Sequence, residues 1–139
     1  MKWVYRVWLV VFMIGILAAC GSKAQAVSDS TKETVLAFSE AKSDNLLAGM
    51  NAGDYVMFSK DFDQGMLNAM NQLEFEKLKK DRDAKLGLYV SRTVNSVLQQ
   101  GNFYVVVYDA QFEKDDAVTI RVVFRFDEPH EVSGLWFNK

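Results

Sequence analysis

The sequence predicts an α+β domain in which N-terminal helices pack on one face of a curved, four-stranded antiparallel sheet. Two observations predict this class. Helix caps and apolar residues spaced three and four apart mark the first half of the domain, and from Leu88 onward apolar residues recur at every second position. The strand-like runs are separated by short, turn-rich breaks, and such tight connections favour antiparallel neighbours.

The first 19 residues have the composition of a secretory signal peptide. Lys2 and Arg6 precede a run of thirteen apolar or small residues, 7–19. A helix of that length extends about 20 Å, which is too short for a hydrocarbon core about 30 Å thick. We therefore assign residues 1–19 to a signal peptide and not to a membrane span.

The end of this segment, Leu17-Ala18-Ala19-Cys20, resembles the lipobox of bacterial lipoproteins. In that family the cysteine thiol takes a diacylglycerol and the chain is cut before the cysteine. The resemblance implies that Cys20 becomes a palmitate-carrying N-terminus that holds the protein at a cell-envelope membrane. That membrane is the outer membrane if the host has one, and otherwise the outer face of the plasma membrane.

Two other interpretations of this region stay open. Ala24-Gln25-Ala26 fits an ordinary signal peptidase site, which would release a soluble protein, and Cys20 could be a small apolar residue of an uncleaved anchor. We prefer lipidation because Cys20 is the only cysteine of the chain. Once Cys20 is acylated, no thiol remains for a disulfide or a zinc–thiolate site.

The rest of the chain divides into a short polar tether, residues 20–30, and one domain, residues 31–139. Without Lys2 and Arg6 the 16 basic side chains of the chain become 14, against 18 acidic ones. A mildly acidic domain without a basic stripe argues against a nucleic-acid partner.

Capping residues mark where the helices of the first half of the domain begin and end. Ser30 and Glu33 form a capping box that predicts the start of the first helix. Gly53 can take the left-handed conformation that ends this helix, and Asp54 can cap a short second helix over residues 55–60.

A further turn is predicted over 66–70, and a second capping box then predicts a charged helix. This box consists of Asn71 and Glu74, and the helix is expected to end near Gly87. Opposite charges four residues apart within it are typical of a solvated helix.

Four strands are expected after Gly87. Their ranges are 88–99, 103–113, 117–127 and 131–137. In the third strand one face is predicted to be buried against the helices, and it carries Val118, Ile120, Val122, Phe124 and Phe126. Arg121 and Arg125 are expected on the opposite face, beside the aromatic residues of the neighbouring strand.

The segment NAGDYVMFSKDFD and the closing Gly-Leu-Trp-Phe resemble the NTF2-like superfamily, and within it exported domains of unknown function of the DUF3887 type. The likeness covers nearly all of residues 31–139. It implies an NTF2-like, cystatin-like cone with an apolar pocket between the sheet and the helices. The residues that we assign to this pocket are Tyr55, Phe58, Phe62, Tyr89 and Trp136.

No set of residues predicts catalysis or a metal site. His130, the only histidine, follows Pro129 at the rim of the sheet, where a surface histidine is favoured over a general base. Asp54, Asp61 and Asp63 are interpreted as a helix cap and solvated carboxylates. We therefore expect no catalytic residues, no metal and no cofactor.

The leading functional hypothesis is a non-enzymatic envelope lipoprotein that binds a small apolar ligand or a protein partner. It depends on apolar residues on strands whose other face already contributes to a core, which are Tyr104, Tyr108, Phe112, Leu135 and Phe137. Either the sheet curls and hides both of its faces, or one apolar surface meets a partner. One alternative is an enzyme of unrecognised type that uses Asp61 or Tyr89. The other is a structural lipoprotein that forms a homodimer through its sheet.

Overall fold

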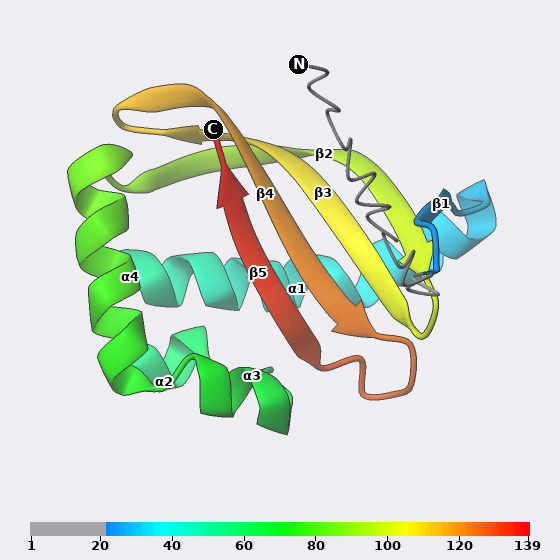
Figure 1. Cartoon of the computed structure of the whole chain (residues 1–139). Helices are drawn as coiled ribbons and strands as arrows, with labels where there is room; N and C mark the ends of the chain where they lie inside the picture. The colour runs from blue at the N-terminus through cyan, green and yellow to red at the C-terminus, as the bar shows by residue number, and fades with distance from the viewer. Residues whose placement is uncertain (1–21) are drawn as a thin grey trace, which may run out of the picture.

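The computed structural model describes residues 22–139 and has the predicted α+β class, with helices followed by an antiparallel sheet (Figure 1). The sheet has five strands in the order β1-β2-β3-β4-β5. The elements in chain order are β1 (Gln25–Ala26), α1 (Asp29–Ala52), α2 (Tyr55–Phe58), α3 (Gln64–Ala69), α4 (Gln72–Lys85), β2 (Tyr89–Gln100), β3 (Phe103–Phe112), β4 (Asp115–Arg125) and β5 (Val132–Asn138).

The fifth strand, β1, is the part of the sheet that the sequence did not predict. Gln25 and Ala26 pair antiparallel with Gln99 and Leu98 at the edge of β2. A strand of two residues carries no readable alternation of apolar and polar positions, so its pairing becomes visible only in three dimensions. The predicted signal peptide and Cys20 lie outside the described residues.

The first helix begins two residues earlier than its predicted cap. Ser28 has an extended backbone and its hydroxyl accepts a hydrogen bond from Thr31 N–H at 3.3 Å, whereas Ser30 lies inside α1. The predicted end is confirmed. Gly53 takes φ 69°, and its N–H donates to the carbonyl of Met50.

The short helices α2 and α3 and the charged helix α4 each begin at a side chain that accepts a backbone hydrogen bond. Asp54 caps α2 through Met57 N–H at 3.0 Å, as predicted. Asp63 caps α3, so this carboxylate is not simply solvated. Asn71 caps α4 through Glu74 N–H at 3.1 Å, which confirms the start predicted for this helix.

Strand register decides which side chains reach the core. Tyr108 pairs with Ile120, and Tyr104 pairs with Phe124, so both tyrosines lie on the helix side of the sheet. Tyr108 and Phe112 are buried in the core. The expectation that these aromatics form a second, partner-binding face is therefore wrong, because cross-strand partners always share a face.

The core lies between this face and α1, which crosses behind the sheet in Figure 1. In β4 the predicted face is buried at Val118, Ile120, Val122 and Phe124. Phe126 is an exception and is 43% exposed, because β4 ends at Arg125. Arg121 lies on the opposite face, as predicted, and its cross-strand neighbours are Val107 of β3 and the aromatic Trp136 of β5.

The helical layer is tightened by a close backbone contact between α1 and α2. A Cβ placed at Gly49 would lie 2.7 Å from Phe58 Cα and 2.9 Å from the carbonyl carbon of Met57. Only glycine allows this approach, which brings the Phe58 ring into the core beside Phe75 at 4.6 Å.

Candidate functional site

A groove lies between α4 and β5 and has a volume of about 320 Å³. Six of its eleven lining residues are apolar. The apolar residues are Leu78, Leu86, Val118, Leu135, Trp136 and Phe137, and the others are Asp81, Arg82, Lys85, Asn138 and Lys139. A concave, mostly apolar site with a few polar groups at its border is typical of a binding site for a small molecule or a peptide.

Charged side chains lie at the border of the groove. On α4, Lys85 forms an ion pair with Asp81 at 2.9 Å. At the end of β5, Lys139 forms one with Asp115 at 2.8 Å. The lysines of both pairs are well exposed, so these contacts contribute little to stability, and the ammonium groups remain accessible to a ligand.

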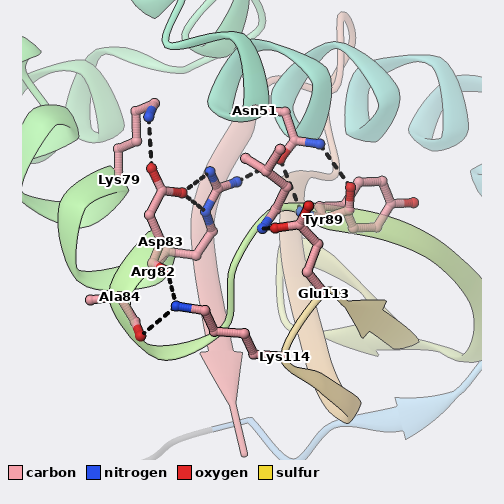
Figure 2. A network of polar contacts seen from close by, with 9 residues as sticks. Asn51, Lys79, Arg82, Asp83, Ala84, Tyr89, Glu113 and Lys114 are labelled. Atoms are coloured by element: carbon pink, nitrogen blue, oxygen red, sulfur yellow. Dashed lines mark hydrogen bonds and ion pairs between the residues drawn. The ribbon is translucent and has the colours of Figure 1, made fainter.

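The position of α4 beside the sheet depends on Asn51, near the end of α1 (Figure 2). The side-chain amide of Asn51 donates to the carbonyl of Tyr89 at 2.8 Å and accepts from the N–H of Tyr89 at 3.0 Å. The same amide oxygen accepts from Arg82 Nη1 at 2.7 Å. One amide therefore joins the C-terminal part of α1, the start of β2 and the last turn of α4.

Arg82 is 3% exposed, and its charge is neutralised within α4. Its Nε donates to the carboxylate of Asp83 at 3.0 Å, and Nη2 also contacts this carboxylate. Lys79 lies 2.7 Å from the second oxygen of the same carboxylate. Although burial alone raises the pKa of Asp83, hydrogen bonds from Lys79 and Arg82 outweigh it and lower the pKa below its usual value.

The end of α4 is also held by the β3–β4 turn. Lys114 Nζ donates to the carbonyls of Asp83 at 3.1 Å and Ala84 at 3.2 Å (Figure 2). These are carbonyls of the last helical turn, where a cation is favourable. The wall of the groove formed by α4 is therefore fixed at its C-terminal end by two independent contacts.

The opposite wall, β5, is held at its start by the segment before α3. Val132 N–H donates to the carbonyl of Asp61 at 2.7 Å, and Asp63 N–H donates to the carbonyl of Val132 at 2.9 Å. The Asp63 carboxylate accepts from the hydroxyl of Ser133 and lies 3.4 Å from Arg125 Nη1. Asp63 thus connects α3, β4 and β5.

Hydrogen bonding controls the ionisation of Asp63. Burial acts to raise its pKa, but hydrogen bonds from Ser133, Met66 N–H and Arg125 outweigh burial and hold the pKa below its usual range. Asp63 is therefore a structural carboxylate that stays ionised, and it is not suited to act as a general acid near neutral pH.

A second polar cluster lies between α1 and the sheet. Tyr108 Oη donates to Glu40 at 2.7 Å and lies 3.0 Å from the hydroxyl of Ser43. Arg92 lies over the Tyr108 ring at 4.8 Å from its centre and forms an ion pair with Asp44 at 2.8 Å. Burial raises the pKa of Tyr108, so its hydroxyl stays protonated and acts as a fixed donor.

The five residues assigned to an apolar pocket lie in three places. Phe58 and Phe62 are buried and pack against each other at 5.0 Å between ring centres, and Tyr55 packs on the neighbouring Phe75. Tyr89 packs on Phe112 and accepts from Arg92 Nη1. Of the five, only Trp136 lines the groove between α4 and β5.

His130 is at the rim of the sheet, as predicted, but it has defined neighbours. Its ring stacks on Phe38 at 3.9 Å, and its Nδ1 lies 3.1 Å from the carbonyl of Arg125. Lys42 Nζ donates to the carbonyl of His130 at 3.1 Å. These contacts make His130 a packing residue that orders the connection between β4 and β5.

Arg82 is the residue that the sequence analysis missed. The charge pattern of α4 predicts a solvated side chain at Arg82. However, Arg82 falls on the same helical stripe as Phe75, Leu78 and Leu86. These positions are three, seven and eleven residues from Phe75, which is the spacing of one buried face. The signal in the sequence that indicates a buried Arg82 is therefore its position as a cation among the apolar residues of this face.

Within residues 22–139, no three or more His, Cys, Asp or Glu side chains are grouped so that they could hold a metal ion. None of the helices in this part of the chain is long and apolar enough to cross a membrane. The two residues considered as candidates for catalysis, Asp61 and Tyr89, form hydrogen bonds with different side chains. Asp61 accepts from Asn45 at 3.5 Å, and Tyr89 accepts from Arg92.

The ionisation of Asp63 leads to a prediction about acid stability. Because its pKa is lowered in the folded state, Asp63 contributes stability that is present above the ordinary value of 3.8 and is lost as the pH falls through the folded pKa. Asp63→Asn keeps a capping oxygen but loses the charge. We expect it to cost about 1–2 kcal/mol at pH 7.

The measurement is urea unfolding of both proteins between pH 7 and pH 2. The cost of Asp63→Asn should shrink as the pH falls below about 4. Asp54→Asn makes the same exchange at the exposed cap of α2 and is the matched control for the loss of a capping carboxylate. A cost of Asp63→Asn that does not change with pH would contradict the assigned role of the carboxylate.

Sequence comparison places this fold in a family. The family described as "Protein of unknown function (DUF3887)" matches residues 43–135. The matched region runs from α1 to the middle of β5 and contains Asn51, Arg82 and most of the residues that line the groove. No curated protein matches the chain, and no solved structure matches it.

Proposed function

We propose that this chain, which belongs to the DUF3887 family of proteins of unknown function, is an exported lipoprotein whose domain binds an apolar ligand without catalysis. The observation that carries the binding role is the apolar groove between α4 and β5. Its walls are fixed by the Asn51–Arg82 contact on one side and by Asp63 on the other. Preformed walls reduce the entropy that binding must overcome.

The lipobox around Cys20 supports a membrane anchor at the N-terminus of the mature chain. The first strand, β1, begins at Gln25, so only residues 21–24 separate Cys20 from the sheet. Four extended residues reach about 13 Å, so a lipid on Cys20 holds the domain close to the membrane surface. The protein then lies in the cell envelope, on the outer membrane if the host has one and otherwise on the outer face of the plasma membrane.

The arrangement of elements also supports the NTF2-like, cystatin-like cone as the fold. The helices precede the four long strands, β2 to β5, in the chain, and they cover one face of the sheet. In this proposal, however, the binding site is not the interior between sheet and helices, because Phe58, Phe62 and Phe75 fill that space. It is the groove at the border of the sheet.

A homodimer through the sheet is a second candidate, and Trp136 is the observation that favours it. Its side chain is 53% exposed, and its six-membered ring lies against Gly134, on the face opposite the helices. Val123, which is close to Gly134, extends this apolar surface. Large exposed aromatic side chains of this kind are enriched where proteins meet.

The anchor is tested with Cys20→Ser. Because the thiol is the proposed site of acylation, this variant should lose all incorporation of radiolabelled palmitate in the native host. The wild-type chain, expressed in parallel, should be labelled and should sediment with membranes. Labelling of Cys20→Ser at the level of the wild type would contradict the lipoprotein assignment.

The groove is tested with 1-anilinonaphthalene-8-sulfonate, an apolar probe with one negative charge, on residues 22–139. Leu78→Trp should fill the groove and weaken binding of the probe at least tenfold, because Leu78 lines it. Leu73→Trp makes the same change on the same helix at a residue that is 65% exposed, and binding should not change. Fluorescence titration measures both, and equal binding to the two variants would contradict the assignment of the site.

A further inference from the structure

We propose that the occupant of the groove is an extended peptide that pairs with the free edge of β5 as an additional strand. This inference rests on the proposed binding function and names the class of its ligand. In such strand addition, main-chain hydrogen bonds give affinity and pockets for alternate side chains give specificity.

The first observation is that β5 is an edge strand whose outer side is only partly occupied. Its start is covered, because both backbone groups of Val132 bond to Asp61 and Asp63. From Gly134 to Asn138, the backbone groups in the described structure pair with β4 alone. Alternate residues of this stretch therefore present N–H and C=O groups to the free side.

The second observation is the course of the groove. Five consecutive residues, 135–139, line it. Successive side chains of a strand point to opposite faces, so a run of consecutive lining residues means that the groove follows the edge of the strand. The unpaired backbone groups of β5 therefore face the groove, and the apolar side chains of Leu78 and Leu86 on α4 form its other wall.

The third observation is that this part of the edge carries none of the residues that usually block pairing. Edge strands of soluble proteins are usually blocked by a proline, a charged side chain or a bulge. The stretch Gly134-Leu135-Trp136-Phe137-Asn138 contains neither proline nor charge. The irregularity in the β4–β5 pairing lies before it, between Val132 and Gly134.

The charge of the groove identifies the kind of peptide. Lys85 and Lys139 hold exposed ammonium groups at its border, in surface ion pairs with Asp81 and Asp115, whereas the guanidinium of Arg82 is buried and already paired with Asp83. Because exposed ion pairs are weak, these two ammonium groups can bind the carboxylates of a peptide whose apolar residues lie between two acidic ones.

The test uses the full chain in phosphatidylcholine vesicles and a fluorescein-labelled peptide, Glu-Val-Thr-Val-Thr-Val-Glu. We expect saturable binding by fluorescence anisotropy. We also expect the edge-facing amides between Gly134 and Asn138 to slow their hydrogen exchange at least tenfold when the peptide is bound. Methylating alternate peptide nitrogens, which removes the donors but keeps the side chains, should weaken binding at least tenfold.

Charge is tested in the same assay. The double variant Lys85→Glu, Lys139→Glu should bind the peptide at least tenfold more weakly and should prefer a version with Lys in place of both Glu residues. The matched control Lys77→Glu, Lys80→Glu makes the same change on α4 at positions that do not line the groove. This control variant should still bind the acidic peptide more tightly than the version with Lys.

Four results would overturn the inference. Binding of the peptide without protection of the β5 amides, or equal binding of the N-methylated peptide, would exclude strand addition. Protection of the same amides without peptide, together with a dimer in sedimentation equilibrium, would identify a second copy as the occupant. If no peptide binds but the apolar probe binds and responds to Leu78→Trp, the proposed function stands and only strand addition fails.

Discussion

The side-chain amide of Asn51 is the contact on which the relative positions of the elements depend. It saturates both backbone groups of Tyr89, the first residue of the sheet's main strands, and accepts from the buried guanidinium of Arg82. The helix α1, the strand β2 and the helix α4 therefore meet at one amide (Figure 2). A hydrogen bond to a charged group contributes about 1.5–3 kcal/mol, so arrangements that break the Asn51–Arg82 contact lie higher in free energy. A polar contact of this kind specifies one arrangement more strictly than apolar packing does.

The groove is a consequence of this constraint. Arg82 fastens the last turn of α4 to α1 and β2 at one end of the sheet, and Lys114 holds its terminal carbonyls. Asp63 fastens the start of β5 at the opposite end. Between these two attachments neither wall can collapse onto the other, and an apolar channel remains beside an unpaired strand edge. The proposed ligand site thus lies where the fold leaves apolar surface and backbone polar groups uncovered together.

Local signals in the sequence were sufficient for most elements and for the fold class. The break at Gly53 and Asp54, the cap at Asn71 and the buried face of β4 each depend on neighbouring residues only. Three features depend on distant pairing and were not predicted. Tyr108 is buried because β3 pairs in one register with β4. β1 exists only as a partner of β2. The groove, finally, joins residues of α4 and β5 that are about 50 positions apart in the chain, and no local pattern connects them.

A double-mutant cycle on Asn51 and Arg82 tests the central claim most directly. Asn51→Ala, Arg82→Met and the double variant of residues 22–139 are unfolded in urea, and their free energies of unfolding are compared with that of the wild type. Asn51 and Arg82 are in direct contact, so the account predicts a coupling energy of about 1–3 kcal/mol. Additive effects, with a coupling within about 0.3 kcal/mol of zero, would mean that α4 is positioned by other contacts and would contradict the account.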